Sequence, residues 1–512
     1  MPVWNFVRKS VYQDSVTLMR LSRELEAVPG VRRAAAMMGT PQNRALLKEA
    51  GLLAPDGEAA SPNDLIIAVV ADDLKAAEAA GAAVEAALIT RRRSAMVGPA
   101  AYQPRTLDSG LKALPDANLA LISVPGVYAG AEAMKALRAG LHVMLFSDNV
   151  PVETEIELKR FALARGLFLI GPDCGTAILN GVPLGFANAV LRGRIGIAAA
   201  SGTGLQEVAC LIAALGEGIS HAIGVGGRDL SDEVGGRMMD RALATLAADS
   251  GTEVVCVIGK PPGPSVSRRL QEQVGRLGKP CAVHFMGVLP SGAGLWHAAA
   301  TLEDAAHAAV ALIRRGSPKP VEFTIPATEV EQIVEDAVRA MRPGQRFVRG
   351  LYSGGTLAYE ALGLLNGKLV GVTPGVTGGG AGHRVVDLGE DIFTVGRLHP
   401  MLDGTVRREW IQKDGGDPST AVLLLDVVLG YGAHPDPAGE LLPAVSAVQR
   451  AALAEGRHLT VVASVCGTDA DPQGKRAQTE ALRSSGVAVM PSNAQAARLA
   501  ALIASRLAEK GR

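Results

Sequence analysis

Residues 195–211 read IGIAAASGTGLQEVACL, and residues 347–363 read FVRGLYSGGTLAYEALG. Each stretch begins with a short apolar run, passes through a Ser-Gly turn and continues with the apolar spacing of a helix. Each therefore predicts a buried strand, a tight turn and a helix. When the two stretches are aligned, Ser201 falls on Ser353, and the leucines and alanines that follow also coincide. This agreement indicates an internal repeat.

The repeat continues toward the C-terminus. A predicted strand at 254–258 matches one at 422–426, and a predicted closing helix at 301–312 matches one at 492–503. The spacing between the copies grows along the chain, so the second copy contains insertions. The segment 315–326 separates the copies and has the proline content of a linker. We therefore predict two related α/β domains joined end to end.

Two further domains precede the repeat. Predicted strands at 119–124, 143–146 and 167–170 alternate with predicted helices at 129–139 and 153–165. This β-α-β-α-β order predicts a parallel sheet, whose ligands bind beyond the carboxyl ends of the strands. The residues before it predict a small α+β domain. The predicted domains are 1–95, 96–192, 193–316 and 344–512, with a linker and lead-in helix at 317–343.

The composition narrows the class of function. Lys plus Arg (51) balance Asp plus Glu (51), so the chain lacks the positive field that binds nucleic acid or an anionic membrane. Aromatic residues make up 4%, too few for the stacking platforms of nucleic-acid binders. The N-terminus lacks an apolar signal-peptide core and the five cysteines form no CxxC pair, so we expect a cytoplasmic protein with reduced thiols. The histidines and carboxylates show no metal-site spacing, so we expect no metal.

The Ser-Gly turns are the strongest local signal for chemistry. At a helix start, free backbone N–H groups, small residues and a hydroxyl can bind a phosphate or carboxylate. The first predicted cradle is Ser201, Gly202, Thr203 and Gly204, and the second is Ser353, Gly354, Gly355 and Thr356. The alternative is a capped helix after a tight turn, which uses the same residue types.

Three side chains are candidates for catalysis or ligand binding beside these cradles. Lys260 follows a predicted strand, where a parallel sheet presents charge to a ligand, although a surface lysine would look the same. His297 lies on a predicted glycine-flanked loop and could act as a nucleophile toward a phosphoryl group or as a general base. A packed histidine is the alternative there. Cys174 also follows a strand, and we interpret it as structural.

A glycine-rich tract between residues 374 and 382 offers another set of amides. It could wrap a diphosphate or an acyl phosphate, with His383 or Arg384 closing over it. The binding residues predicted in it are Gly378, Gly379 and Gly380. The tract lacks the Gly-Lys-Ser/Thr ending of a Walker loop, and a linker or tight turn is the alternative. His399 and Asp403 could form a further pair, but Pro400 favours a loop over a helix there.

These motifs, taken in order, resemble the FdrA family, whose core is similar to the α subunit of succinyl-CoA synthetase followed by a second ligase-type domain. The resemblance to FdrA covers nearly the whole chain, and that to the synthetase covers residues 119–313. The matching segments are Val124-Pro125, Ala139-Gly140, Gly171-Pro172-Asp173-Cys174, Ser201-Gly202-Thr203-Gly204-Leu205, Gly224-Val225-Gly226-Gly227 and His297-Ala298. The resemblance implies an α/β fold with a small α+β domain, a Rossmann-like CoA-binding-type domain and two flavodoxin-like ligase-type domains.

The resemblance also implies a chemistry. In the synthetase family the helix start after the Ser-Gly-Thr turn supports a phosphohistidine, and His297 stands where that histidine is expected. Lys260 replaces the strand-end glutamate of that family. FdrA proteins are associated with purine and allantoin catabolism, which implies a subunit of oxamate carbamoyltransferase. That enzyme converts oxalurate and phosphate to oxamate and carbamoyl phosphate, a preformed acyl phosphate that a lysine beside an anion cradle would suit.

We therefore expect an enzyme that handles acyl phosphates. The favoured hypothesis is a carbamoyltransferase subunit in a hetero-oligomer, with Ser201 to Gly204 binding phosphate, Lys260 stabilising negative charge and His297 moving protons. The first alternative is an NDP-forming acyl-CoA ligase subunit, for which CoA and a nucleotide would be cofactors. The second alternative is a non-catalytic scaffold or regulatory subunit.

Overall fold

The computed structural model describes the chain except residues 1, 12, 14, 27, 97–103, 287–295, 376–381, 395–396 and 511–512. It divides into two compact units, residues 1–116 with 394–398 and residues 117–393 with 399–512. The second unit contains the small parallel sheet and both ligase-type domains.

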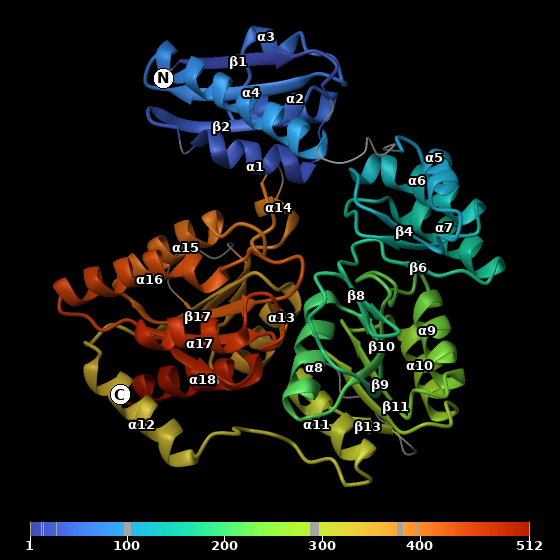
Figure 1. Cartoon of the computed structure of the whole chain (residues 1–512). Helices are drawn as coiled ribbons and strands as arrows, with labels where there is room; N and C mark the ends of the chain where they lie inside the picture. The colour runs from blue at the N-terminus through green and yellow to red at the C-terminus, as the bar shows by residue number, and fades with distance from the viewer. Residues whose placement is uncertain are drawn as a thin grey trace. The chain divides into compact units, whose positions relative to one another are not determined.

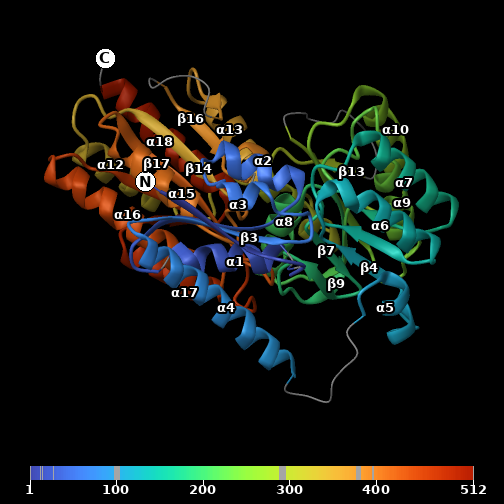
Figure 2. The same ribbon diagram turned by 90° about the horizontal axis from the view of Figure 1, so that it is seen from above.

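The N-terminal unit contains a three-stranded antiparallel sheet with helices on both faces. Its elements are β1 (Val3–Arg8), α1 (Ser15–Glu26), β2 (Val31–Met38), α2 (Pro41–Glu49), α3 (Pro55–Glu58), β3 (Leu65–Ala71), α4 (Leu74–Met96) and α5 (Leu107–Ala113), with strand order β1-β3-β2. Alternate side chains of β3 point to opposite faces. Leu65 and Ile67 pack with α1 and α4, whereas Ile66 packs with α2, and Figure 2 shows β3 between these two sets of helices. Cover on both faces explains why β3 is apolar at every position.

A small parallel sheet follows. It consists of β4 (Leu119–Ile122), α6 (Gly126–Arg138), β5 (His142–Leu145), α7 (Val152–Ala164) and β6 (Leu169–Ile170), with strand order β4-β5-β6. The loops after β4 and β5 contact each other: Val124 N donates to Ser147 Oγ at 3.0 Å, and a Cβ on Gly126 would lie 2.3 Å from Asp148 O. The predicted β-α-β-α-β unit is therefore present, with its loops tied together at the carboxyl edge.

The first ligase-type domain is a seven-stranded sheet between two pairs of helices. Its strands are β7 (Thr176–Leu179), β8 (Val182–Gly185), β9 (Arg192–Ala200), β10 (Ile219–Gly224), β11 (Val254–Gly259), β12 (Cys281–Phe285) and β13 (Trp296–Ala298). Its helices are α8 (Gly202–Ala214), α9 (Arg237–Ala248), α10 (Pro264–Gly275) and α11 (Leu302–Ile313). Figure 1 shows α8 and α11 on one face and α9 and α10 on the other. The hairpin β7–β8, which lies before the predicted boundary at residue 192, joins this sheet by pairing antiparallel with β10.

The second ligase-type domain repeats this plan. Its strands are β14 (Phe347–Tyr352), β15 (Thr373–Pro374), β16 (Arg384–Asp387), β17 (Thr420–Val428), β18 (Thr460–Cys466) and β19 (Ala488–Met490). Its helices are α12 (Ala327–Ala340), α13 (Gly355–Asn366), α14 (Asp391–Thr394), α15 (Thr405–Gly416), α16 (Pro437–Ala454), α17 (Lys475–Ser484) and α18 (Asn493–Lys510). In Figure 1, β17 runs between α16 and α18.

The strand orders confirm the repeat. The parallel strands lie in the order β13-β12-β11-β9-β10 in the first domain and, apart from the two-residue edge strand β15 beyond β16, in the order β19-β18-β17-β14-β16 in the second. Numbered along the chain, each domain has the flavodoxin-like order 2-1-3-4-5. The predicted fold class, an α/β protein with two related flavodoxin-like domains and a small N-terminal α+β domain, is therefore confirmed.

One apolar core joins the two ligase-type domains. It contains Leu205 of α8 and Ala305 of α11 from the first domain, and Leu357 of α13 and Ala500 of α18 from the second. The linker between α11 and α12 is also held by hydrogen bonds, since Val321 N donates to Asp304. The two domains therefore form one packed body within the second unit.

Candidate functional site

The two predicted Ser-Gly turns lie against each other. Ser201 caps α8, because its Oγ accepts a hydrogen bond from Gly204 N at 3.0 Å. The same oxygen lies 2.6 Å from Oγ1 of Thr356, which belongs to the first turn of α13. Both hydroxyl-bearing side chains are buried. The structure thus brings together residues that sequence analysis placed in two separate cradles.

The second predicted cradle is already filled by a carboxylate. Asp426, in β17, accepts hydrogen bonds from Ser353 N and Gly354 N, both at 2.8 Å, and from Ser353 Oγ at 3.0 Å. Asp426 therefore occupies the donors of Ser353 and Gly354 that sequence analysis assigned to a phosphate or carboxylate ligand, while the binding roles of Gly355 and Thr356 stay predictions. Arg407 neutralises this carboxylate at 2.9 Å, and both charged groups are buried. The donors of this turn thus bind a carboxylate of the protein itself, that of Asp426.

The first cradle keeps part of its binding capacity. The Gly204 amide is already used within the protein by the Ser201 hydroxyl, which also contacts Thr356, and the phosphate-binding role of Ser201 stays a prediction. The amides of Gly202 and Thr203 remain, since neither donates to an acceptor among the described residues. Both residues are half-buried at the positive end of α8, where backbone N–H groups favour an anion.

The strand order places this helix start at a binding position. In a 2-1-3-4-5 sheet the ligand crevice lies where the order reverses, between strands 1 and 3. Those strands are β9 and β11 here. Ser201 follows β9 and Lys260 follows β11, and the register aligns Ala200 with Gly259 at the same edge. Lys260 is exposed, so its charge is available to a ligand beside the free amides.

Asp387 is a neighbour that sequence analysis missed. It ends β16, and its Oδ1 accepts a hydrogen bond from Gly389 N at 2.8 Å. Burial raises its pKa to about 7, with Glu390 and Asp426 adding to the rise, while the Gly389 amide and Lys260 oppose it. An acidic residue directly after the apolar pair 385–386 was the signal for a charged group at this strand end.

His297 does not lie on a loop as predicted. It is in β13, paired opposite Ala282 of β12, whereas Phe285 of β12 is level with the carboxyl edge at Ala200. Three strand spacings across the sheet and three residues along it place His297 roughly 17 Å from Ala200, the residue before Ser201. A proton-transfer or phosphohistidine role beside the α8 turn is therefore not supported by this position.

Most of the glycine-rich tract, including Gly378, Gly379 and Gly380, lies outside the described residues. His383 accepts a hydrogen bond from Val348 N, and Arg384 pairs with Asp414. Both stand at the amino end of β16, opposite the carboxyl edge, and their closing over a phosphate held by the tract stays a prediction.

His399 and Asp403 do not pair as the i, i+4 spacing suggested. Nδ1 of His399 accepts a hydrogen bond from Met401 N, and Asp403 accepts one from Thr405 N. Burial lowers the pKa of His399 to about 4, so its imidazole is neutral with the proton on Nε2. His399 nevertheless lies close to the candidate site, since a Cβ on Gly389 would be 2.7 Å from Nε2.

Cys174 is structural, as expected. Burial raises the pKa of its thiol to about 11, so it carries no thiolate near neutral pH. It belongs to the small apolar cluster around Met144 that joins the small parallel sheet to β7.

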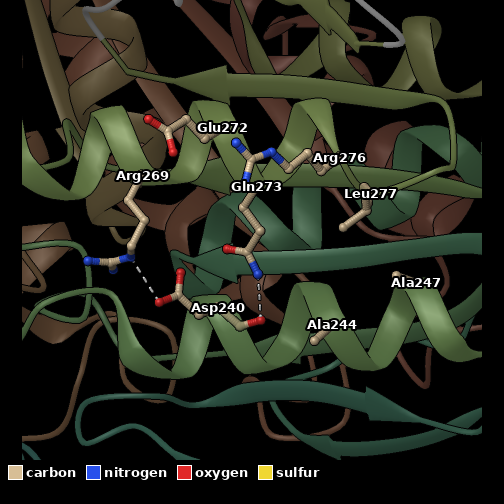
Figure 3. Close-up of a pocket in the computed structure, with 8 residues that line it drawn as sticks. All are labelled: Asp240, Ala244, Ala247, Arg269, Glu272, Gln273, Arg276 and Leu277. Carbon is tan, nitrogen blue, oxygen red and sulfur yellow. Dashed lines mark hydrogen bonds and ion pairs between the residues drawn. The ribbon is translucent and has the colours of Figure 1, made fainter.

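A groove with a volume of about 460 Å³ lies between α9 and α10 (Figure 3). Arg269 pairs with Asp240 at 3.0 Å, and Gln273 donates to the Asp240 carbonyl oxygen at 2.9 Å. The groove is on a face of the sheet, and none of the predicted site residues lines it.

The candidate site is instead the junction of Gly202, Thr203, Lys260 and Asp387, which the strand ends and helix starts described above bring together.

The second of the paired flavodoxin-like domains is a domain of the CoA-ligase class. A model described as CoA-ligase matches residues 351–503, and one described as AllF, heavy metal-associated domain, matches residues 1–104. YahF of Escherichia coli strain K12 is 38% identical, with 96% of this chain and 97% of YahF covered. The chain therefore belongs to the same family as YahF, an FdrA-like family related to the α subunit of succinyl-CoA synthetase.

Other relatives match shorter parts. The mitochondrial ADP-forming succinate–CoA ligase subunit alpha-2 of Trichomonas vaginalis is 34% identical over 29% of this chain and 49% of its own length. The corresponding α subunit of Methanothermobacter thermautotrophicus is 29% identical over 37% of this chain and 64% of its own. The apo dinucleotide-forming acetyl-coenzyme A synthetase 1 of Ca. Korarchaeum cryptofilum has 16% identity and a TM-score of 0.31, covering 77% of this chain and 84% of that chain. These ligase α subunits thus match only part of their own length.

The residues do not fit a heavy-metal site in the N-terminal domain. Residues 1–104 contain neither cysteine nor histidine, the ligands that soft metals prefer. Across the described residues no group of three or more His, Cys, Asp or Glu side chains could hold a metal ion. Among the described helices none is both long and apolar enough to cross a membrane.

The small parallel sheet does not fit a complete coenzyme crevice. Doubly wound sheets bind dinucleotide-like ligands where the strand order reverses. The order β4-β5-β6 runs in one direction and contains no reversal among the described strands. We therefore derive no step through CoA at this sheet.

Proposed function

We propose that this chain is an acyl-phosphate-handling enzyme subunit that binds the phosphate at the start of α8. The observation that carries the proposal is the pair of free amides at Gly202 and Thr203, next to the strand-order reversal and Lys260. Two helix-start amides and a cation are the donors that bind and neutralise a phosphoryl group. Asp426 occupies the Ser353 and Gly354 amides of the second turn, so the start of α8 is the cradle that we propose for the phosphate.

The chemistry follows from these donors. When an acyl phosphate reacts with an acceptor, negative charge accumulates on the oxygen that joins the acyl carbon to phosphorus. Fixed amides and the Lys260 ammonium stabilise that charge as it develops. The first turns of α8 and α13 are held together by the 2.6 Å contact between Ser201 and Thr356, so the donors are in place before the substrate binds.

The acceptor separates two candidate functions. The ligase relatives favour CoA as the acceptor, with a nucleotide supplying the phosphate through another subunit. Lys260 at the strand end and the one-directional small sheet favour a carbamoyltransferase, in which oxamate accepts the carbamoyl group from carbamoyl phosphate. The position of His297 and the Nε2 proton of His399 also favour direct transfer over a phosphohistidine.

A proline substitution tests the phosphate site. Gly202 is the first residue of α8, where proline is tolerated because its amide makes no intrahelical hydrogen bond. Ser201 already has the extended backbone, φ −166° and ψ 119°, that a residue before proline requires. Gly202→Pro thus deletes one anion donor, and Gly202→Ala is the matched control that keeps it.

The measurement is binding of inorganic phosphate and carbamoyl phosphate to the full chain by calorimetry. Loss of one hydrogen bond to a charged group costs about 1.5–3 kcal/mol, which is roughly a tenfold to hundredfold weaker affinity. We expect that loss in Gly202→Pro and Lys260→Met but not in Gly202→Ala. Equal affinities in the proline and alanine variants would reject the proposed phosphate site.

Turnover assays on the complex from the native host decide between the acceptors. Phosphate-dependent formation of carbamoyl phosphate from oxalurate would support the transferase. Formation of an acyl-CoA that needs both CoA and a nucleotide would support the ligase. If either activity persists undiminished when both turns are filled by Gly202→Trp and Gly354→Trp, the chain is a scaffold and the active site lies on a partner.

A further inference from the structure

We propose that Asp387 is the acid–base residue of this site, accepting a proton from the acyl acceptor during transfer. The inference rests on the proposed function, because it assigns a role in the same reaction. It concerns a residue outside both Ser-Gly turns, contributed by the opposite ligase-type domain.

Contacts connect Asp387 to the phosphate cradle step by step. A Cβ on Gly354 would lie 3.0 Å from Cγ2 of Thr203, so the first turns of α13 and α8 touch. A Cβ on Gly355 would lie 2.4 Å from Oδ2 of Asp387. The carboxylate therefore packs directly against the helix start that contacts Thr203. Glycine at both positions is what allows this approach.

The other carboxylate oxygen is fixed by the backbone. Oδ1 accepts the Gly389 amide at 2.8 Å, and a Cβ on that glycine would lie 2.7 Å from His399 Nε2 and 3.1 Å from Asp387 Oδ1. One oxygen is thus anchored, while the side chain remains half-buried rather than sealed. An anchored but accessible carboxylate has a fixed position from which to exchange a proton.

The charges around Asp387 hold it between its two protonation states. Glu390 and Asp426 disfavour the carboxylate, although Arg407 pairs with Asp426, and Lys260 favours it. His399 is neutral and adds no charge. Burial is the largest influence and raises the pKa of Asp387 to about 7, where a group can both accept and donate protons at neutral pH.

The proposed step balances as follows. The acceptor nucleophile, an N–H or S–H group, forms a bond to the acyl carbon and gives its proton to the Asp387 carboxylate. The bond between the acyl carbon and the bridging oxygen breaks, and its electron pair leaves with phosphate. Asp387 then returns the proton to phosphate or water. In the reverse direction the protonated carboxyl group supplies that proton to the departing acceptor.

The test is the pH dependence of kcat/KM for the complex in the full chain and three variants. The native enzyme should show a limb with an apparent pKa near 7. Asp387→Asn should remove that limb and lower kcat/KM by about 10²- to 10⁴-fold, the usual contribution of a general acid or base. Lys260→Met should move the limb to higher pH and Glu390→Gln to lower pH, because the two charges act on Asp387 in opposite directions.

An activity-independent readout separates this inference from the proposed function. Burial also raises the pKa of Glu303 and of Glu360 to about 7, so the infrared readout is a difference. The protonated-carboxyl signal that titrates near pH 7 should be weaker by one carboxyl group in Asp387→Asn than in the native full chain. If the chain turns over neither acyl substrate but this difference is observed, the proposed function fails while the proton-holding site stands. Persistence of the limb in Asp387→Asn would overturn the inference. So would shifts of the same sign in Lys260→Met and Glu390→Gln.

Discussion

Removing the carboxylate of Asp426 should turn the second Ser-Gly turn into an anion-binding site. In Asp426→Ala the Arg407 guanidinium, the Ser353 hydroxyl and the amides of Ser353 and Gly354 all lose the acceptor that they share. Breaking a buried ion pair by deleting one partner costs about 3–5 kcal/mol. The separate hydrogen bonds would sum to more, but they act as one network and are not additive. We expect a loss of about 4 kcal/mol.

Phosphate should recover part of this loss. At roughly one hundred times its dissociation constant, a ligand that binds only the folded state adds about 2.7 kcal/mol. Urea unfolding with and without phosphate measures both effects, and hydrogen exchange at Ser353 and Gly354 localises them. Asp426→Asn is the control, because its amide fills the space and leaves no room for the anion.

Two results would refute this reasoning. A loss below about 1 kcal/mol in Asp426→Ala would mean that the buried pair does not hold the turn. An equal gain from phosphate in Asp426→Asn would mean that the anion binds elsewhere.

Four further substitutions test buried charges and close contacts within the second unit. Burial raises the pKa of Glu360 from 4.5 to about 7, so ionisation of this carboxyl group destabilises the folded state. As the pH rises from 4.5 to 7, the free energy of unfolding of the native protein should therefore fall by about 3 kcal/mol. Glu360→Gln should not show this fall, and urea midpoints measured against pH test the difference. Gly355→Ala should lower the free energy of unfolding by about 1–3 kcal/mol, because its Cβ would meet Asp387 at 2.4 Å. Gly363→Ala, on the same helix, is the control, because its Cβ meets nothing within 4 Å. It should raise the free energy of unfolding by about 0.5–1 kcal/mol in the same assay. Lys159→Met removes the buried cation that pairs with both Glu155 and Asp229, and should lower stability by about 3–5 kcal/mol, visible as a fall in the thermal midpoint. Glu155 keeps its pair with Arg228, and Asp229 keeps two backbone amides.

The sequence predicted the architecture because local patterns decide it. The apolar runs of β9, β11, β12 and β17 are buried on both faces, and each stands between turn residues that mark its ends. The duplicated Ser-Gly turn then identified the strand that leads each repeat. The hairpin β7–β8 was harder, because its place in the sheet depends on pairing with β10, far along the chain.

The candidate site was predictable in position but not in detail. Strand ends placed Ser201 and Lys260 correctly at one edge. The direction of the Ser201 hydroxyl depends on Thr356, 155 residues away, and the amides of Ser353 are satisfied by Asp426, 73 residues away. Such contacts leave no local trace. His297 was misplaced because flanking glycines suggest a loop, whereas the register of β13 against β12 is a property of the folded sheet.

The apolar core shared by the two ligase-type domains also determines where the chain can be cut without separating them. The covalent connection between the two flavodoxin-like halves runs through the segment between Ile313 and Ala327, while leucine and alanine side chains of four helices lock the halves together. A protease cut in that segment would leave a tight non-covalent pair. The same architecture could equally be encoded as two polypeptides that assemble after synthesis, so fusion or fission of genes at this point would preserve the junction.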